Sequence, residues 1–213
     1  MIFTLDKLIP LPMTGIPVDG SAVWETESFT FNQEKRYLVE AASGKGKTSL
    51  LSIMYGLRKD YRGKLLIDGT DASTFNPKEW SHFRKQRVSY IFQGLELFGD
   101  LSATDNILLK NQITKFKTRQ QIIEMADRLD MAPFLHRKCR LLSFGQQQRI
   151  AIIRALCQPF EFLFADECFS HIDKNNSAIA MQLITEVCDQ QGAGLILTSL
   201  GNNQHTFDEH ITI

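Results

Sequence analysis

The sequence has no uninterrupted apolar run that approaches the ~20 residues needed to span a membrane as a helix. Its first residues also lack the basic stretch followed by a long apolar stretch that marks a signal peptide. No two cysteines form a C-x-x-C pair; the four are Cys139, Cys157, Cys168 and Cys188. We therefore expect reduced thiols, and we expect any role at a membrane to be exercised at its surface through a partner.

An excess of charge of either sign is also missing, because 24 lysines and arginines balance 24 aspartates and glutamates. This neutrality gives no electrostatic footprint for nucleic acid, although a local patch could still exist. The chain contains no internal repeat and no low-complexity tract. Its 213 residues suit one compact domain, with ordinary apolar content for a sizeable core.

Short apolar runs alternate with segments of helical spacing along most of the chain. Residues 1–11 and 22–31 alternate apolar and polar side chains, which predicts a β-rich N-terminal part. Further strands are expected at 37–39, 64–67, 88–92, 160–164 and 195–198. Helices are expected at 48–55, 146–156 and 178–188, with a helical stretch at about 105–135. This alternation indicates an α/β fold with a mainly parallel sheet covered by helices.

A glycine-containing loop follows the strand expected at 37–39 and opens the next helix. It comprises Ala41, Ala42, Ser43, Gly44, Lys45, Gly46, Lys47, Thr48 and Ser49. In this context the backbone N–H groups and the helix N-terminus can bind phosphates, with Lys47 for the β- and γ-phosphates and the Thr48 hydroxyl for Mg²⁺. Ala41 stands where G-x-x-x-x-G-K-[ST] has its first glycine, so we expect a slightly altered loop entry. The alternative is a surface turn rich in lysine and glycine.

Two carboxylates end the apolar run at 160–165. Asp166 occupies the position from which a strand-end aspartate holds Mg²⁺ in phosphate-loop proteins, directly or through water. Glu167 follows it and can polarise an attacking water. The alternative is a pair of solvated loop carboxylates. Their position at the end of an expected strand favours a ligand-binding site, because ligands bind at the carboxyl ends of parallel strands.

The run Leu142-Ser-Phe-Gly-Gln-Gln-Gln-Arg resembles the LSGGQ signature of the ABC (ATP-binding cassette) ATPase family. The resemblance implies that one subunit's signature completes the ATP site of a second subunit, through Ser143, Phe144, Gly145 and Gln146. Phe144 replaces the family's first glycine. Ser143 and Gln146 also read as a helix-capping pair, and both interpretations can hold together.

Two further segments resemble family loops. Tyr90-Ile-Phe-Gln93 is similar to the Q-loop, which implies that Gln93 contacts Mg²⁺ and the attacking water. Ser170-His-Ile-Asp173 is similar to the D-loop, with Asp173 at its aspartate position. Taken alone, Gln93 is a strand-end polar residue and Asp173 is a helix cap. Thr48, Gln93 and Asp166 are thus the expected metal ligands, and the expected ligands of the protein are ATP and Mg²⁺.

Other positions depart from the family pattern. Cys168 and Phe169 follow Glu167 in place of proline and threonine. Ser199 stands where the family usually has its switch histidine, which makes Ser199 a catalytic candidate and predicts slow hydrolysis, and His205 lies farther on. The family's adenine-stacking aromatic maps near Thr14. Trp24 is nearby; packing between strands is its favoured interpretation and an adenine contact is the alternative.

The resemblance covers nearly the whole chain and implies a phosphate-loop NTPase core with an N-terminal antiparallel β subdomain. We expect residues 1–213 to form a single ABC ATPase domain in which about 94–141 are an inserted helical subdomain. The apolar residues near the Q-loop either dock a membrane partner or pack against that subdomain; they are Phe92, Leu95, Leu97 and Phe98.

The resemblance implies an ATP-hydrolysing transporter subunit that drives separate membrane permease subunits by ATP-dependent dimerisation, as a homodimer or with another ABC ATPase. It would lie on the cytoplasmic face of a membrane. Leu163-Phe-Ala-Asp-Glu resembles the branch of lipoprotein-release, macrolide-export and cell-division ATPases. The alternative is a slow nucleotide switch in membrane remodelling or DNA maintenance. Only about fifty residues without sustained heptads separate Gln93 from Ser143, and no nucleic acid is expected.

Overall fold

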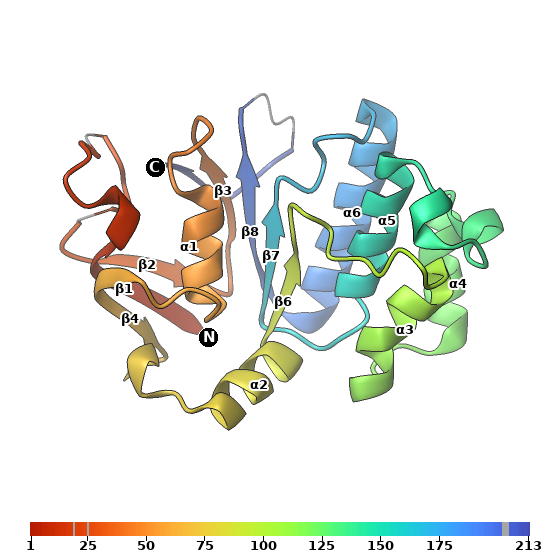
Figure 1. Cartoon of the computed structure of the whole chain (residues 1–213), viewed down its shortest axis with the longest axis horizontal. Helices are drawn as coiled ribbons and strands as arrows, with labels where there is room; N and C mark the ends of the chain where they lie inside the picture. Colours follow the sequence, from red (N-terminus) through yellow and green to blue (C-terminus); the bar gives the residue numbers. More distant parts are fainter. Residues whose placement is uncertain (19, 25, 202–204) are drawn as a thin grey trace.

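The computed structural model describes residues 1–18, 20–24, 26–201 and 205–213. Its centre is a parallel sheet of five strands in the order β6-β7-β8-β3-β9. The strands are β3 (Arg36–Glu40), β6 (Val88–Ile91), β7 (Phe162–Asp166), β8 (Gly194–Ser199) and β9 (Glu209–Thr212). Because β3, β6, β7 and β8 are parallel, their carboxyl ends meet at one edge, which lies at the top of Figure 1.

A second, antiparallel sheet has the order β2-β1-β4-β5 and confirms the expected N-terminal β part. Its strands are β1 (Ile2–Pro10), β2 (Phe29–Asn32), β4 (Tyr61–Ile67) and β5 (Thr70–Asp71). The strand expected at 22–31 was wrong over its first part, since 22–24 and 26–28 are not in a strand. The Ser21 hydroxyl accepts the N–H groups of Val23 and Trp24 at 3.2 and 2.9 Å. These local bonds take donors that a strand ladder would use.

Six α-helices lie in the described ranges and connect the strands: α1 (Lys47–Met54), α2 (Pro77–Gln86), α3 (Ala103–Thr114), α4 (Arg119–Arg128), α5 (Phe144–Ala155) and α6 (Lys174–Gln191). Reciprocal capping boxes begin α2, α3, α4 and α5, each with a polar N-cap side chain bonded to the third helical residue. Among the described residues, none of the helices combines the length and apolar character needed to cross a membrane.

Alternating side chains of the parallel sheet enter two different cores. Leu163, Ala165 and Leu195 pack with apolar residues of α5 and α6. Phe162 and Phe164 belong to the other core, with residues of α1 and of the antiparallel sheet. The parallel sheet therefore forms a middle layer and gives the site edge a rigid base. The four cysteines are free and buried, and burial raises the pKa of Cys157 and Cys188 to about 12, as fits inert thiols.

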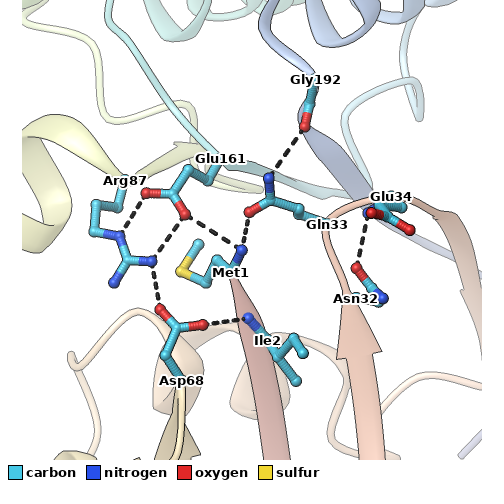
Figure 2. A network of polar contacts seen from close by, with 9 residues as sticks. All are labelled: Met1, Ile2, Asn32, Gln33, Glu34, Asp68, Arg87, Glu161 and Gly192. Atoms are coloured by element: carbon cyan, nitrogen blue, oxygen red, sulfur yellow. Dashed lines mark hydrogen bonds and ion pairs between the residues drawn. The ribbon is translucent and has the colours of Figure 1, made fainter.

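A polar network ties the two sheets together opposite the site edge (Figure 2). The Arg87 guanidinium donates to Glu161 at 2.6 and 2.8 Å and to Asp68 at 2.5 Å. Asp68 accepts the N–H of Ile2 at 2.8 Å, and the Met1 amino group lies 3.4 Å from Glu161. Arg87 thus links the turn after β4 with the starts of β1, β6 and β7.

Candidate functional site

The loop between β3 and α1 is shaped by two left-handed glycines. Gly44 has φ 81° and Gly46, the N-cap of α1, has φ 96°. Lys47 is only 4% exposed, and its Nζ donates to the carbonyls of Ala41 at 2.7 Å and Ala42 at 3.2 Å. Ala41 has no positive φ and packs against the core, so its methyl group is accommodated. The expected strand–loop–helix context of a phosphate loop is therefore present.

Two side chains from the N-terminal part of the chain, Met13 and Trp24, lie against this loop. Trp24 is 2% exposed, and its indole N–H donates to the Lys45 carbonyl at 3.2 Å. A Cβ at Gly46 would lie 2.8 Å from the Met13 sulfur and 3.0 Å from the Trp24 ring. Burial of Trp24 agrees with the favoured interpretation, but the tryptophan packs on the phosphate loop as well as within the core. Residue spacing carried no signal for this contact.

The acidic pair lies beside the loop, at the end of β7. Asp166 is 1% exposed and accepts a hydrogen bond from the Thr198 hydroxyl at 2.6 Å. Burial raises the pKa of Asp166, against the opposing effect of hydrogen bonds from Thr198 and Thr48. Thr198 also accepts the Glu167 N–H at 3.1 Å, so one hydroxyl fixes both acidic residues. In the sequence, Thr198 is only the last residue of the strand expected at 195–198; a polar residue closing a buried strand was the available signal.

Glu167 connects the remaining parts of the cluster. Its carboxylate lies 3.3 Å from the Lys47 Nζ and accepts the amide of Gln93 at 3.0 Å. Glu167 has φ 47°, a left-handed conformation that is unusual for a residue with a side chain. The structure therefore brings Lys47, Gln93, Asp166 and Glu167 together from three strand ends that lie far apart in sequence.

The oxygen groups of this cluster fit Mg²⁺. Thr48 hydrogen-bonds to Asp166, and Gln93 lies one contact away through Glu167. Hydroxyl, carboxylate and amide oxygens are the ligand types that Mg²⁺ prefers. Within the described residues, no group of three or more His, Cys, Asp or Glu side chains could hold a metal. These residues fit an ion that takes its other ligands from phosphate oxygens and water.

The signature segment begins α5 and lies next to the D-loop. The Ser143 hydroxyl accepts the Gln146 N–H at 3.3 Å, and Gln146 accepts the Ser143 N–H at 2.9 Å, which confirms the capping interpretation. A Cβ at Gly145 would lie 2.7 Å from the His171 carbonyl oxygen. In the described part of the chain, no hydrogen bond or ion pair joins 143–146 to 41–49.

Comparison with known proteins matches residues 25–170 to the family model described as ABC transporter. This chain belongs to the ABC transporter family. The matched range contains the expected phosphate loop, Gln93, the acidic pair and the signature segment. The sequence resemblance is therefore confirmed.

Two curated relatives give the range of similarity. The molybdate/tungstate import ATP-binding protein WtpC of Pyrococcus horikoshii is 36% identical over 149 residues, which cover 68% of this chain and 41% of that protein. The lipoprotein-releasing system ATP-binding protein LolD of Syntrophotalea carbinolica is 31% identical over 168 residues, covering 78% of this chain and 74% of that protein. The chain thus spans less than half the length of the first relative.

A solved structure confirms the fold. The dimeric structure of MJ0796, a bacterial ABC transporter cassette, superposes with a TM-score of 0.78 and 23% identity, covering 94% of this chain and 88% of that one. At this identity the likeness concerns the fold alone. It agrees with the expected α/β phosphate-loop core, its parallel sheet and its antiparallel β part.

Three other positions of this ABC chain lie near the site edge. The Ser199 hydroxyl accepts the Gly201 N–H at 3.2 Å, which closes a turn after β8. His205 lies 3.4 Å from the Ser177 hydroxyl and against the ring of Phe169, and residues 202–204 lie outside the described part. Asp173 caps α6 by accepting the Asn176 N–H at 3.0 Å, as its helix-cap interpretation predicts.

The apolar residues after the Q-loop divide between burial and exposure. Leu95 is 2% exposed, Leu97 packs against the core, and Phe92 stacks on Tyr90 at 4.1 Å between ring centroids. Phe98 is 60% exposed. Packing therefore accounts for three of the four, and Phe98 alone presents its ring to solvent among them.

Proposed function

We propose that this chain drives a membrane permease through ATP-dependent pairing of two ABC subunits. One observation carries the proposal: Lys47, Gln93, Asp166 and Glu167 form one cluster, whereas the signature helix contacts the D-loop. Its Phe144 ring packs against His171, and its Gln148 bonds to Ser170 and to the His171 N–H. A single chain thus presents a phosphate loop and a signature that are not joined by a described contact. Two copies, or this chain and another ABC subunit, would each complete the other's site.

The residues would take distinct roles at a bound ATP. The phosphate loop holds the phosphates with its N–H groups, and Lys47, now paired with Glu167, turns its charge to the γ-phosphate. Glu167 is then left to accept a hydrogen bond from the attacking water and orient it, with Gln93 beside it. Mg²⁺ held by Thr48, Asp166 and Gln93 would supply positive charge to the phosphate oxygens. Ser143 and the Gly145 backbone would donate to the partner's γ-phosphate.

The organisation of the chain fits this role. We take residues 1–213 as one ABC domain in which about 94–141, the part that contains α3 and α4, form a helical subdomain. The subunit would sit on the cytoplasmic face of a membrane, with its permease near the Q-loop. The names of relatives include import and export systems, so the permease would determine the substrate.

Replacing Glu167 by glutamine tests the shared site. The substituted glutamine keeps the size of the side chain and removes its negative charge, so ATP binding should persist while hydrolysis slows by ~10²–10³. The ATP-bound dimer should then accumulate and elute earlier in size-exclusion chromatography with ATP and Mg²⁺. Glu124→Gln, on the exposed face of α4, is the matched control and should behave as wild type.

Two results would contradict the proposal. One is a Glu167→Gln protein that binds ATP normally yet stays monomeric at high protein and ATP concentrations. The other is hydrolysis at the wild-type rate in this variant. The first result would exclude an ATP site shared between two subunits. The second would exclude a role for Glu167 in hydrolysis.

A further inference from the structure

The segment between β7 and α6 carries a histidine that has no role in the ATP chemistry described above. Phe169 and Ile172 of this segment pack against the core, and His171 lies between them with its side chain exposed. In Figure 1 the segment joins the top of β7 to α6. The backbone on both sides of His171 is therefore fixed by packing, while its imidazole remains accessible.

Hydrogen bonds around His171 determine which ring nitrogen carries the proton. Gln148 of α5 is 1% exposed; its Oε1 accepts the His171 N–H at 3.2 Å, and its Nε2 donates to Ser170 Oγ at 3.1 Å. Ser170 Oγ lies 2.9 Å from His171 Nδ1. Because the serine oxygen already accepts from Gln148, its own proton is available for Nδ1. This arrangement favours the tautomer that carries its proton on Nε2.

The signature segment contacts the same histidine. The Phe144 ring, which is 45% exposed, meets the imidazole edge to face at 4.5 Å between ring centroids. A Cβ at Gly145 would lie 2.7 Å from the His171 carbonyl oxygen, so this close approach requires glycine. Within the described ranges, no hydrogen bond or ion pair engages His171 Nε2. The imidazole is thus oriented on its Nδ1 side and against Phe144, and it keeps one unused N–H donor.

The place of His171 beside the signature determines which phosphate its donor can reach. In the proposed function, Ser143 and the Gly145 N–H donate to the γ-phosphate that a second subunit holds. His171 borders Gly145, whereas no described hydrogen bond or ion pair joins it to residues 41–49 of its own chain. A donor beside a phosphate makes a charge-assisted hydrogen bond, and a preorganised donor strengthens as charge develops in the transition state. The phosphate within its reach is therefore the partner's.

We propose that His171 is a catalytic residue that acts across a dimer of two copies of this chain. Its Nε2–H donates a hydrogen bond to the γ-phosphate of the ATP bound by the partner subunit, and it transfers no proton. The inference rests on the proposed function, which pairs two subunits. Ser199 ends β8 in the chain that binds the ATP, so His171 is a separate contact from the opposite chain. Phe144 and Ser170 are positioning residues for the ring.

Steady-state hydrolysis with ATP and Mg²⁺ gives the first test. His171→Ala should lower kcat by roughly 10–10²-fold, because a positioned donor is lost from the transition state. kcat and kcat/KM should fall together, since the contact matters little for binding the ground state. His171→Gln places an amide N–H near the same point and should recover most of the rate. His82→Ala, at an exposed position on α2, is the matched control and should equal wild type.

Two further measurements distinguish a phosphate contact from a structural role. We expect His171→Ala to melt at the wild-type temperature, and we expect the double variant Glu167→Gln/His171→Ala to form the ATP-bound dimer in size-exclusion chromatography. Phe144→Gly removes the ring that orients the imidazole and should lower kcat several-fold, whereas Phe144→Leu keeps an apolar contact and should lower it less. Loss of the ATP-bound dimer in the double variant would mean that His171 holds the subunits together and would contradict a role in the chemical step.

Mixing two impaired chains shows which subunit His171 serves. His171→Ala keeps Glu167, and Glu167→Gln keeps His171, so a mixed dimer has one site with both groups and one site with neither. The chains are combined before ATP and Mg²⁺ are added, and the first turnover is followed. About a quarter of the bound ATP should be hydrolysed at the wild-type rate constant, because about half of the dimers are mixed and one of their two sites is intact. Neither chain alone should show this fast phase.

The possible failures point to different conclusions. If Glu167→Gln forms the ATP-bound dimer but mixing gives no fast phase, His171 does not act across the dimer, and the proposed function still stands. If Glu167→Gln stays monomeric, the shared site and the role of His171 are both excluded. Hydrolysis at the wild-type rate in His171→Ala, or a His171→Gln protein as slow as His171→Ala, would overturn the assignment of the Nε2–H donor.

Discussion

Ser199 ends β8 next to Thr198, the residue whose hydroxyl binds both Asp166 and the Glu167 backbone. The Ser199 hydroxyl is occupied by the turn at Gly201, and a serine is too short and uncharged to replace an imidazole. We expect Ser199→His to raise steady-state ATP hydrolysis by up to ~10²-fold, since one well-placed transition-state contact contributes that much. The rate of the isolated chain with ATP and Mg²⁺ measures it.

The matched control is Leu200→His at the next position, which is 59% exposed. This variant adds an imidazole to the same loop without placing it at the strand end, so its rate should stay at that of wild type. If Ser199→His is no faster, and wild type already turns over quickly without its membrane partner, Ser199 is mechanistically silent. The slow-switch alternative would then lose its support.

At single residues, the sequence predicted those whose spacing carries chemistry. Lys47, Asp166 and Glu167 could be found because a phosphate loop and a strand-end acidic pair have recognisable contexts. Thr198 and Trp24 escaped because their roles arise from packing between distant segments: Thr198 pairs with Asp166 across two strands, and Trp24 reaches Lys45 from an irregular turn. The structure shows where these side chains lie, and the roles of all the expected site residues, Gln93, Ser143 and Ser199 included, stay predictions.

Among the elements, the network centred on Arg87 lies where four strands begin or turn (Figure 2). Arg87→Ala should lower the free energy of unfolding by about 1–2 kcal/mol at neutral pH. The expected loss is modest because the charged side chains of the network are partly exposed and solvent screens them. Urea unfolding measures it. Arg62→Ala, an exposed arginine of β4 without a described ion pair, should change stability by less than about 0.5 kcal/mol.

The same network makes this difference depend on pH. The hydrogen bonds from Arg87 lower the pKa of Glu161, and they lower that of Asp68 although burial opposes them. Carboxyls with depressed folded-state pKa values stabilise the fold above their unfolded values of about 4. That contribution disappears as the pH falls through the folded-state pKa. The gap between wild type and Arg87→Ala should therefore narrow below about pH 4, and a constant gap would show that packing alone is lost.

Helix boundaries were expected only in part: α2 (Pro77–Gln86) was not expected, and α3 and α5 begin two residues before the expected helices. The local signal was present, since capping boxes at Asn76, Ser102, Thr118 and Ser143 begin four helices, but only the cap at Ser143 was recognised from the sequence. The strand expected from residue 22 failed because alternation continued through a segment whose N–H groups bond to Ser21. Periodicity detects which face is apolar, but it does not detect a competing local acceptor.

For the whole molecule, the order of strands and helices was enough to predict a parallel sheet, while the relation between its two cores was not. That relation depends on aromatic contacts such as those of Phe3 with Phe162 and Phe164, at 5.4 and 5.7 Å between ring centroids. These contacts join the first strand to the central layer. No sequence motif in β1 or in β7 predicts that these two strands contact each other.

The position of Trp24 gives the protein an intrinsic optical probe of its ATP site. The chain has two tryptophans, and the other, Trp80, packs in α2 against Phe75 and Phe83. In Trp80→Phe all indole emission comes from the ring that donates to the Lys45 carbonyl. Its intensity or wavelength should change saturably as ATP and Mg²⁺ are titrated, whereas Trp24→Phe should show no such change. An unresponsive Trp80→Phe protein that still binds ATP would mean that the loop keeps its shape when phosphates arrive.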